Sequence, residues 1–245
     1  MTTALPPVVS QQEWLAARKA LLAKEKEATK LRDQINAERR RLPMVRVEKD
    51  YVFTGPDGEL SLAGLFEGRS QLYIHHFMWR DDLDTGCPSC TASAGMNFTP
   101  QVLAHLHSRD ITFAAVSRAP AEKIQAYKAK HDWTFPWYSS HGSDFSYDMH
   151  ASLDESRRPV EYNYLSKEEL KQRGFPEEMM KGDMPANSVF LRDGDEVFHT
   201  YTAYTRGLDQ LFTPYNFIDF TPYGRQETWE DSPEGWPKLT DRLER

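Results

Sequence analysis

Cys87 and Cys90 are the only two cysteines in a chain of 245 residues, and they lie three residues apart in the sequence GCPSC. Two thiols at this spacing can interconvert between a dithiol and a disulfide, and they can also supply half of a zinc site. An apolar segment precedes the pair and a segment compatible with a helix follows it. The first interpretation is therefore redox chemistry.

A helix that begins at the pair would activate one of the two thiols. Unpaired backbone N–H groups and the positive end of the helix dipole stabilise a thiolate and lower its pKa. Cys87 is then the exposed nucleophile, and Cys90, one helical turn further on, resolves the mixed disulfide. Pro88 suits the first turn, because no amide donor is lost there. Such a thiol–disulfide oxidoreductase requires no cofactor, and it acts on a protein or a small-molecule thiol or disulfide.

Metal binding is an alternative, because His75, His76 and Met78 come shortly before the cysteines. Two thiolates with an imidazole or a thioether suit copper(I) or zinc. In a strand over residues 72–78, His76 and Met78 would share one face and His75 the other, so only part of the set can converge. A copper or zinc carrier or metalloenzyme therefore stays open. A binding or assembly module that does no chemistry is a third possibility.

Arg118 is the third candidate catalytic residue, after the two cysteines. It follows a predicted strand at residues 111–117, at the edge where α/β sheets carry their sites. A guanidinium there could lower the pKa of Cys87 or hold an anionic substrate. It could equally be a surface arginine at the end of a strand.

Composition narrows the partners and the compartment. A formal net charge of −7 gives no support to nucleic-acid binding. No apolar run approaches the roughly 20 residues of a membrane span, and the N-terminus lacks the pattern of a secretory signal. We therefore expect a cytoplasmic protein with no membrane partner. In a reducing compartment a lone C-x-x-C pair is catalytic, transient or metal-bound rather than structural.

The order of elements predicts an α/β domain at about residues 44–213. The charged stretch 154–183 looks like an insertion into it. The other expected elements are a hairpin turning at Gly-Pro-Asp-Gly, central strands at 71–79 and 111–117, helices at 89–108 and 119–132, a short strand at 135–140 and a hairpin at 188–204.

Segments outside the domain form an arm and a tail. Ser10 and Glu13 have the spacing of a capping box, which predicts a long helix over about residues 10–42 within an arm at 1–43. The arm either lies across its own domain or forms the seam of a homodimer. The aromatic, proline-rich tail at 214–245 is expected to pack on the domain. Apolar residues recur along the helix every seven positions at Trp14, Leu21, Ala28, Ile35 and Leu42.

Several segments together resemble one known family. QLYIHHFMW, GCPSC, VSRAP, FPWYSS and VFLRDGD occur in the order seen in the domain-of-unknown-function family 899, and the resemblance extends to the leading WLAAR helix. It covers nearly the whole chain. Membership implies a thioredoxin-like fold, and it supplies no demonstrated substrate.

A more distant similarity is to peroxiredoxins. Cys87-Pro88 looks like their peroxidatic Cys-Pro step, with Cys90 as a nearby resolving thiol. The chain departs from that pattern, because Asp84 replaces a threonine and Arg80 replaces a proline. A thiol peroxidase is therefore an alternative that ranks below dithiol exchange.

The chain also departs from thioredoxin. Gly86 stands where thioredoxins have a tryptophan before the first cysteine. Ala186 stands at the position of their cis-proline, and Pro185 comes one residue earlier. These changes put a thioredoxin-like mode of substrate docking in question.

Overall fold

The computed structural model describes residues 5–238, and the chain divides into two compact units. One unit joins the chain up to Leu42 with the chain from Thr213 onward, and the other is Pro43–Phe212. Among residues 5–238, no helix combines the length and the apolar character that a membrane span needs. The packing of the tail on the domain stays a prediction.

The main sheet of Pro43–Phe212 contains β1 (Val45–Arg46), β2 (Val52–Gly55), β3 (Gly58–Ser61), β4 (Gln71–His76), β7 (Ile111–Ser117), β8 (Trp137–Ser139), β13 (Ala186–Asp193) and β14 (Glu196–Tyr204). Their spatial order is β1-β14-β13-β4-β7-β8-β2-β3. Strands β4, β7 and β8 are parallel. Strand β13 runs antiparallel to β4 on its other side and forms a hairpin with β14.

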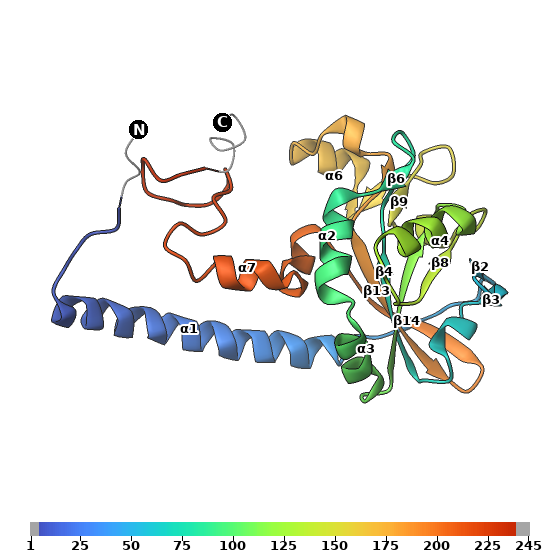
Figure 1. Cartoon of the computed structure of the whole chain (residues 1–245), viewed down its shortest axis with the longest axis horizontal. Coiled ribbons are helices and arrows are strands. Elements are labelled where there is room, and N and C mark those ends of the chain that lie inside the picture. The colour runs from blue at the N-terminus through green and yellow to red at the C-terminus, as the bar shows by residue number, and fades with distance from the viewer. Residues whose placement is uncertain (1–4, 239–245) are drawn as a thin grey trace. The chain divides into compact units, whose positions relative to one another are not determined.

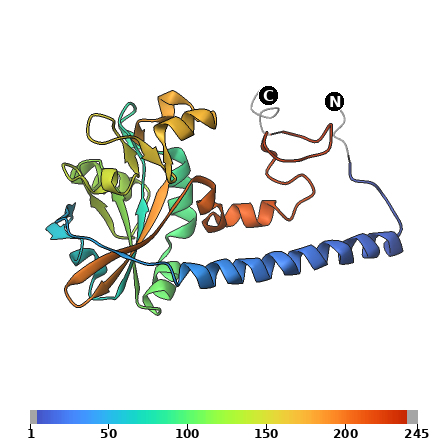
Figure 2. The ribbon, with the colours of Figure 1, turned by 180° about the vertical axis from the view of Figure 1, so that it is seen from behind.

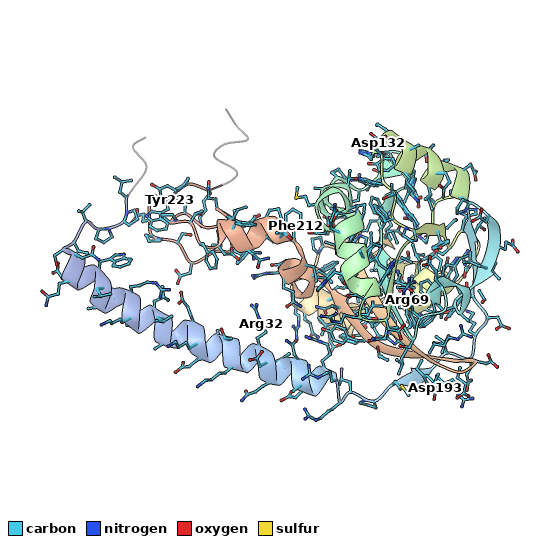
Figure 3. The ribbon with its side chains drawn as sticks, turned by 60° about the horizontal axis from the view of Figure 1, so that its bottom comes forward. Arg32, Arg69, Asp132, Asp193, Phe212 and Tyr223 are labelled. Carbon is cyan, nitrogen blue, oxygen red and sulfur yellow. The ribbon has the colours of Figure 1, made fainter. Side chains whose placement is uncertain are left out.

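This topology is a thioredoxin-like α/β fold, as the sequence predicts. A parallel strand–helix–strand unit lies at the centre, and an antiparallel hairpin extends the sheet from the first of its strands (Figure 1). Both predicted hairpins are present: β2 and β3 pair from Val52↔Ser61 to Gly55↔Gly58, and β13 ends at Asp193, which Figure 3 labels at the turn. The view from behind in Figure 2 shows the same long hairpin.

The single helix predicted at 89–108 is wrong, because two helices occupy this stretch. They are α2 (Pro88–Asn97) and α3 (Pro100–His107). Thr99 caps α3, its hydroxyl accepting a hydrogen bond from the Val102 amide at 3.4 Å. Proline is favoured in the first turn of a helix and disrupts a helix interior, so Pro100 begins a new helix instead of continuing the old one.

Alternating side chains along the central strands divide the core of Pro43–Phe212 into two layers. Ala114 of β7 lies in the same layer as Ile74 of β4. Its neighbour Ala115 lies in the opposite layer, which also holds Cys90 of α2 and Ile124 of α4 (Ala121–Lys130). The second cysteine of the pair is thus part of the hydrophobic core.

The predicted insertion forms a small lobe, which we define as residues 152–183. Tyr162, Leu170 and Met180 are buried together in a third apolar cluster that extends to Tyr204 of β14. In Figures 1 and 2 the lobe lies at the same end of the sheet as the start of α2. Its elements are β9 (Ser152–Leu153), β10 (Glu161–Tyr162), β11 (Leu165–Ser166), α6 (Lys167–Gln172), η2 (Glu177–Met179) and β12 (Gly182–Asp183).

The other unit contains α1 (Gln11–Arg39). The predicted capping box is present: the Ser10 hydroxyl accepts from the Glu13 amide, and the Glu13 carboxylate accepts from the Ser10 amide. No residue of α1 is buried, and Figure 3 shows side chains, among them Arg32, projecting from the helix. The homodimer seam along α1 stays a prediction.

Six further elements complete the two units. The first unit also contains α7 (Thr213–Ile218). The unit Pro43–Phe212 also contains η1 (Gly64–Phe66), β5 (Trp79–Arg80), β6 (Thr85–Gly86), α5 (Phe145–Asp148) and η3 (Thr205–Leu211).

The core assignment predicts unequal costs for two leucine truncations. Leu72 of β4 is 0% exposed, so Leu72→Ala should lower the free energy of unfolding by about 2–5 kcal/mol. Leu83 is 63% exposed, and Leu83→Ala should change it by less than about 0.5 kcal/mol. Urea denaturation measures both. Equal costs for the two variants would contradict the assignment of β4 to the core.

Candidate active site

Cys87 occupies the N-cap of α2, and Pro88 is the first helical residue. The backbone around it is fixed from both sides: the Cys87 amide donates to the Met78 carbonyl at 3.0 Å, and its carbonyl accepts from the Thr91 amide at 2.9 Å. The Thr91 hydroxyl also donates to that carbonyl at 2.8 Å. The sulfur is therefore held at the helix start, as the sequence analysis expects.

Hydrogen bonds to sulfur lower the pKa of Cys87 to about 6. The largest contribution comes from the thiol of Cys90, and burial opposes it. The backbone amides of Cys90 and Ser89, together with the Ser89 hydroxyl, add to the lowering. Because these donors belong to the first turn of α2, the geometry of the helix start produces a thiolate at neutral pH.

Cys90 has the opposite character. Its side chain is 5% exposed within the core layer beneath α2. The hydrogen bond to Cys87 and burial both raise its pKa well above the ordinary value. No disulfide joins the two cysteines. The pair therefore shares one proton, held on the buried sulfur, while the half-buried sulfur carries the negative charge.

Gly86 leaves no room for the tryptophan found in thioredoxins. A Cβ atom built on Gly86 would lie 2.9 Å from the ring of Tyr127 and 3.0 Å from the ring of Phe77. Contacts this short do not occur without displacement of the rings or the backbone. Two aromatic rings thus fill the space in front of the dithiol, and the residue before Cys87 must be glycine.

Arg118 lies where the sequence analysis expects it, at the end of β7, and it lines the same cleft as Cys87. Its guanidinium donates to carboxylates: Nε to Asp183 at 2.5 Å and NH2 to Asp81 at 3.0 Å. It also donates to the Tyr147 hydroxyl at 3.0 Å. Burial would lower the pKa of Arg118, but the charge and hydrogen bond of Asp183 raise it. The main causes of the lowered pKa of Cys87 are Cys90 and Ser89 rather than Arg118.

Arg80 and Asp84, the two departures from the peroxiredoxin pattern, have partners of their own. Arg80 forms two hydrogen bonds with Asp82, at 2.6 and 2.8 Å, and the charge of Cys87 contributes to the raised pKa of Arg80. Asp84 accepts from Lys123 at 2.7 Å and from the Trp79 indole at 3.3 Å. Arg80 is therefore close enough to Cys87 for the thiolate to raise the pKa of its guanidinium.

The two histidines of the metal alternative are engaged by other side chains. His75 contacts the Asn187 side chain at 2.7 Å, and His76 contacts the Ser188 hydroxyl at 2.9 Å. Burial lowers the pKa of His75 to about 4 and that of His76 to about 3. Strand β4 ends at His76, so its alternation does not reach Met78, which lines the cleft with Cys87. Among residues 5–238, no group of three or more His, Cys, Asp or Glu side chains could hold a metal ion.

A cleft of about 870 Å³ opens beside Cys87, and the insertion lobe forms much of its wall. Leu153, Val160 and Met180 supply apolar surface from the lobe. Asp183, at the end of the lobe, is held by the Trp79 amide at 2.9 Å as well as by Arg118. Sequence reasoning missed this wall, because only tertiary packing brings residues 152–183 to the dithiol.

The segment before β13 differs from the one expected of a thioredoxin. No cis peptide bond occurs in residues 5–238, so Pro185 is trans. The backbone just before it is already paired: β12 lies antiparallel to β9, and the Met184 amide donates to the Ala151 carbonyl at 2.8 Å. The insertion lobe therefore occupies an edge that would otherwise be open to an extended peptide.

Fold and site together define a thioredoxin-like protein with a dithiol at the start of a helix. The chain matches the family described as "Bacterial protein of unknown function (DUF899)" over residues 3–242, and it belongs to that family. No curated protein matches it.

Three of the solved structures that are similar to the chain each have a TM-score below 0.5. Peroxiredoxin Q of Xanthomonas campestris has a TM-score of 0.44 and 11% identity, covering 68% of this chain and 87% of its own. Peroxidoxin BcpB of Mycobacterium tuberculosis has a TM-score of 0.44 and 12% identity, and the match covers 72% of this chain and 97% of that protein. A putative protein disulfide isomerase from Bacteroides thetaiotaomicron has a TM-score of 0.40 and 15% identity, and the match covers 71% of this chain and 91% of that protein.

The hydrogen bonds to Cys87 predict how its reactivity depends on pH. Because its pKa is lowered to about 6, the rate of alkylation by iodoacetamide should rise through pH 6 and level off above pH 7. Cys90→Ala removes the largest donor, so the rise should move to higher pH; Cys90→Ser keeps a hydroxyl donor and should move it less. Rates measured by intact mass from pH 4 to 10 test this. A rise centred near pH 9 in the unmodified chain would contradict it.

The rings against Gly86 predict that even a methyl group disturbs the site. Gly86→Ala should lower the free energy of unfolding by about 1–3 kcal/mol. Gly95→Ala, in the same helix as the dithiol, is the matched control. Its Cβ would meet only the Trp133 indole at 3.8 Å, so stability should be unchanged or rise by up to about 1 kcal/mol. Thermal unfolding measures the stability of both variants. A Gly86→Ala variant as stable as the parent would contradict the close packing of the two rings against Gly86.

Proposed function

We propose that this protein is a thiol–disulfide oxidoreductase in which Cys87 attacks and Cys90 resolves. The observation that carries the proposal is the opposite shift of two pKa values at one helix start: that of half-buried Cys87 is lowered to about 6, and that of buried Cys90 is raised. One thiol is poised as a nucleophile at neutral pH, and the other is protected until the first has reacted.

Thiol–disulfide exchange through Cys87 and Cys90 requires no cofactor. The Cys87 thiolate attacks one sulfur of a disulfide, forming a mixed disulfide and releasing the other half as a thiolate. That step removes the negative charge that Cys90 was donating to, and Cys90 can now lose its proton and attack the sulfur of Cys87. The second half of the substrate leaves as a thiolate, and a disulfide between Cys87 and Cys90 remains. A thiol reductant must then restore the dithiol.

The cytoplasm is the compartment that suits this cycle. The two cysteines of the pair are the only ones in the chain, so the protein has no other disulfide that a reducing environment would threaten. Such an environment also supplies the thiol that returns the pair to its reduced state.

Two features favour a disulfide over a peroxide as the substrate. Asp84 stands where peroxiredoxins have a threonine, and it is paired with Lys123 at 2.7 Å. Arg118, a half-buried cation of the cleft, donates to Asp183 and Asp81. Neither group is therefore a donor poised for the oxygens of a peroxide. A thiol peroxidase is the competing outcome in the experiment below.

A single-turnover experiment with bis(2-hydroxyethyl) disulfide tests the proposal. The reduced parent chain should release both halves of the probe and end with an internal disulfide. Cys90→Ser should release one half and keep the other on Cys87, and Cys87→Ser should release neither. Thiol release and intact mass are the measurements. Probe reduction by Cys87→Ser, or no adduct on Cys90→Ser, would overturn the proposal; faster oxidation of Cys87 by hydrogen peroxide than by the probe would assign a peroxidase instead.

A further inference from the structure

The cleft beside Cys87 has the dimensions of a small-molecule site. Its volume of about 870 Å³ falls within the range of roughly 300–1,000 Å³ that such sites occupy. Met78, Trp79 and Leu153 provide apolar walls next to the reactive sulfur. The strand edge before β13 is occupied by β9, so the cleft is built for a compact ligand rather than an extended peptide.

Carboxylates outnumber cations around this cleft by seven to four. Asp81 and Asp82 come from the loop after β5, and Asp183 is the last residue of the insertion lobe. The other four also belong to the lobe and line its side of the cleft: Asp154, Glu155, Glu177 and Glu178. The thiolate of Cys87 adds a further negative charge at neutral pH.

Three of the four cations are already engaged by carboxylates of the cleft. Arg118 is paired with Asp183 and Asp81. Arg80 is paired with Asp82 at 2.6 Å, and Lys167 with Glu155 at 2.6 Å. Only the fourth, Lys181, makes no ion pair within residues 5–238. An anionic ligand would therefore have to displace an existing pair or rely on Lys181 alone.

Some carboxylates, by contrast, stay open to a ligand. Glu178 makes no ion pair within the part of the chain that the structure describes. Asp154 forms only a long ion pair, with Arg157 at 3.9 Å, and one of its oxygens accepts from the amide and the hydroxyl of Ser156. Glu177 is paired outside the cleft with Lys171 at 2.9 Å. A positively charged group that entered the cleft would meet these carboxylates, and the Cys87 thiolate, without breaking a pair inside it.

We propose, on the basis of the function proposed above, that the substrate of Cys87 is a small disulfide carrying amino groups, and that doubly anionic disulfides are poor substrates. The recognition is electrostatic: ammonium groups approach the carboxylates of the insertion lobe while the disulfide lies over the apolar wall against the thiolate. Long-range attraction of this kind raises the rate of association and weakens as salt is added.

Three disulfides with two methylene groups between each sulfur and its terminal group test the charge preference. Cystamine, bis(2-hydroxyethyl) disulfide and 3,3′-dithiodipropionate differ in ending with ammonium, hydroxyl or carboxylate groups. Each rate constant is divided by that of 2-mercaptoethanol with the same disulfide at the same pH, which removes differences in intrinsic reactivity. The normalised order should be cystamine, then the neutral probe, then the dicarboxylate, and the spread should shrink at 1 M salt.

Variants at Glu178 assign the preference to the cleft. Glu178→Gln should lower the normalised preference for cystamine by about 1.5- to 5-fold, and Glu178→Lys should lower it further. Glu59→Gln, on an exposed position of β3 outside the cleft, is the matched control and should leave it unchanged.

The outcomes separate this inference from the function on which it rests. A flat or reversed order among the three probes, or a normalised preference for cystamine that is unaffected in Glu178→Lys, overturns the substrate assignment while leaving dithiol exchange intact. Failure of the neutral probe to react through Cys87 overturns the proposed function itself.

Discussion

A negatively charged sulfur at the half-buried start of α2 depends on donors that only a folded chain can supply. Burial works against the Cys87 thiolate, and the hydrogen bond from Cys90 outweighs it together with the amides of the first helical turn. Cys90 can act as that donor only while it stays protonated in the core, packed beneath α2. The central strands, the break before α3 and the rings around Gly86 all serve to keep the two sulfurs in this relation.

A second interaction joins the sheet to the insertion lobe. The carboxylate of Asp183, whose side chain is 6% exposed, accepts from Arg118, from the Trp79 amide and from the Ser152 hydroxyl. These partners come from the end of β7, from β5 and from the first strand of the lobe. Because a buried carboxylate without partners is costly, this cluster holds the lobe against the sheet and thereby forms the cleft. Arg118 is paired with the carboxylates of Asp183 and Asp81 in this cluster, and its part in the chemistry stays a prediction.

Much of the fold can be predicted from the sequence, because in many segments the local sequence signals agree with the pattern of buried residues. The apolar run before GCPSC predicts β4, and the Ser10–Glu13 box predicts the start of α1. Thr99-Pro100 is a helix-start signal that would have separated α2 from α3. Only part of the site can be predicted from the sequence. The cysteine pair is recognisable as a motif, whereas the partners of Arg118 and the acidic wall of the cleft arise from contacts between residues that are distant in sequence. Asp183 is 65 residues from Arg118, and no local pattern marks it.

Equilibration of the chain in dithiothreitol buffers of graded ratio tests most directly whether the two sulfurs form a redox couple. Free thiols are trapped by alkylation and counted by intact mass. If the shared proton and the helix start have the role described, Cys87 and Cys90 form an internal disulfide reversibly, in a single transition with the slope of a two-electron couple, about 30 mV for each tenfold change in ratio. If both thiols remain free at every ratio, or if oxidation yields only disulfides between chains, the dithiol mechanism is contradicted.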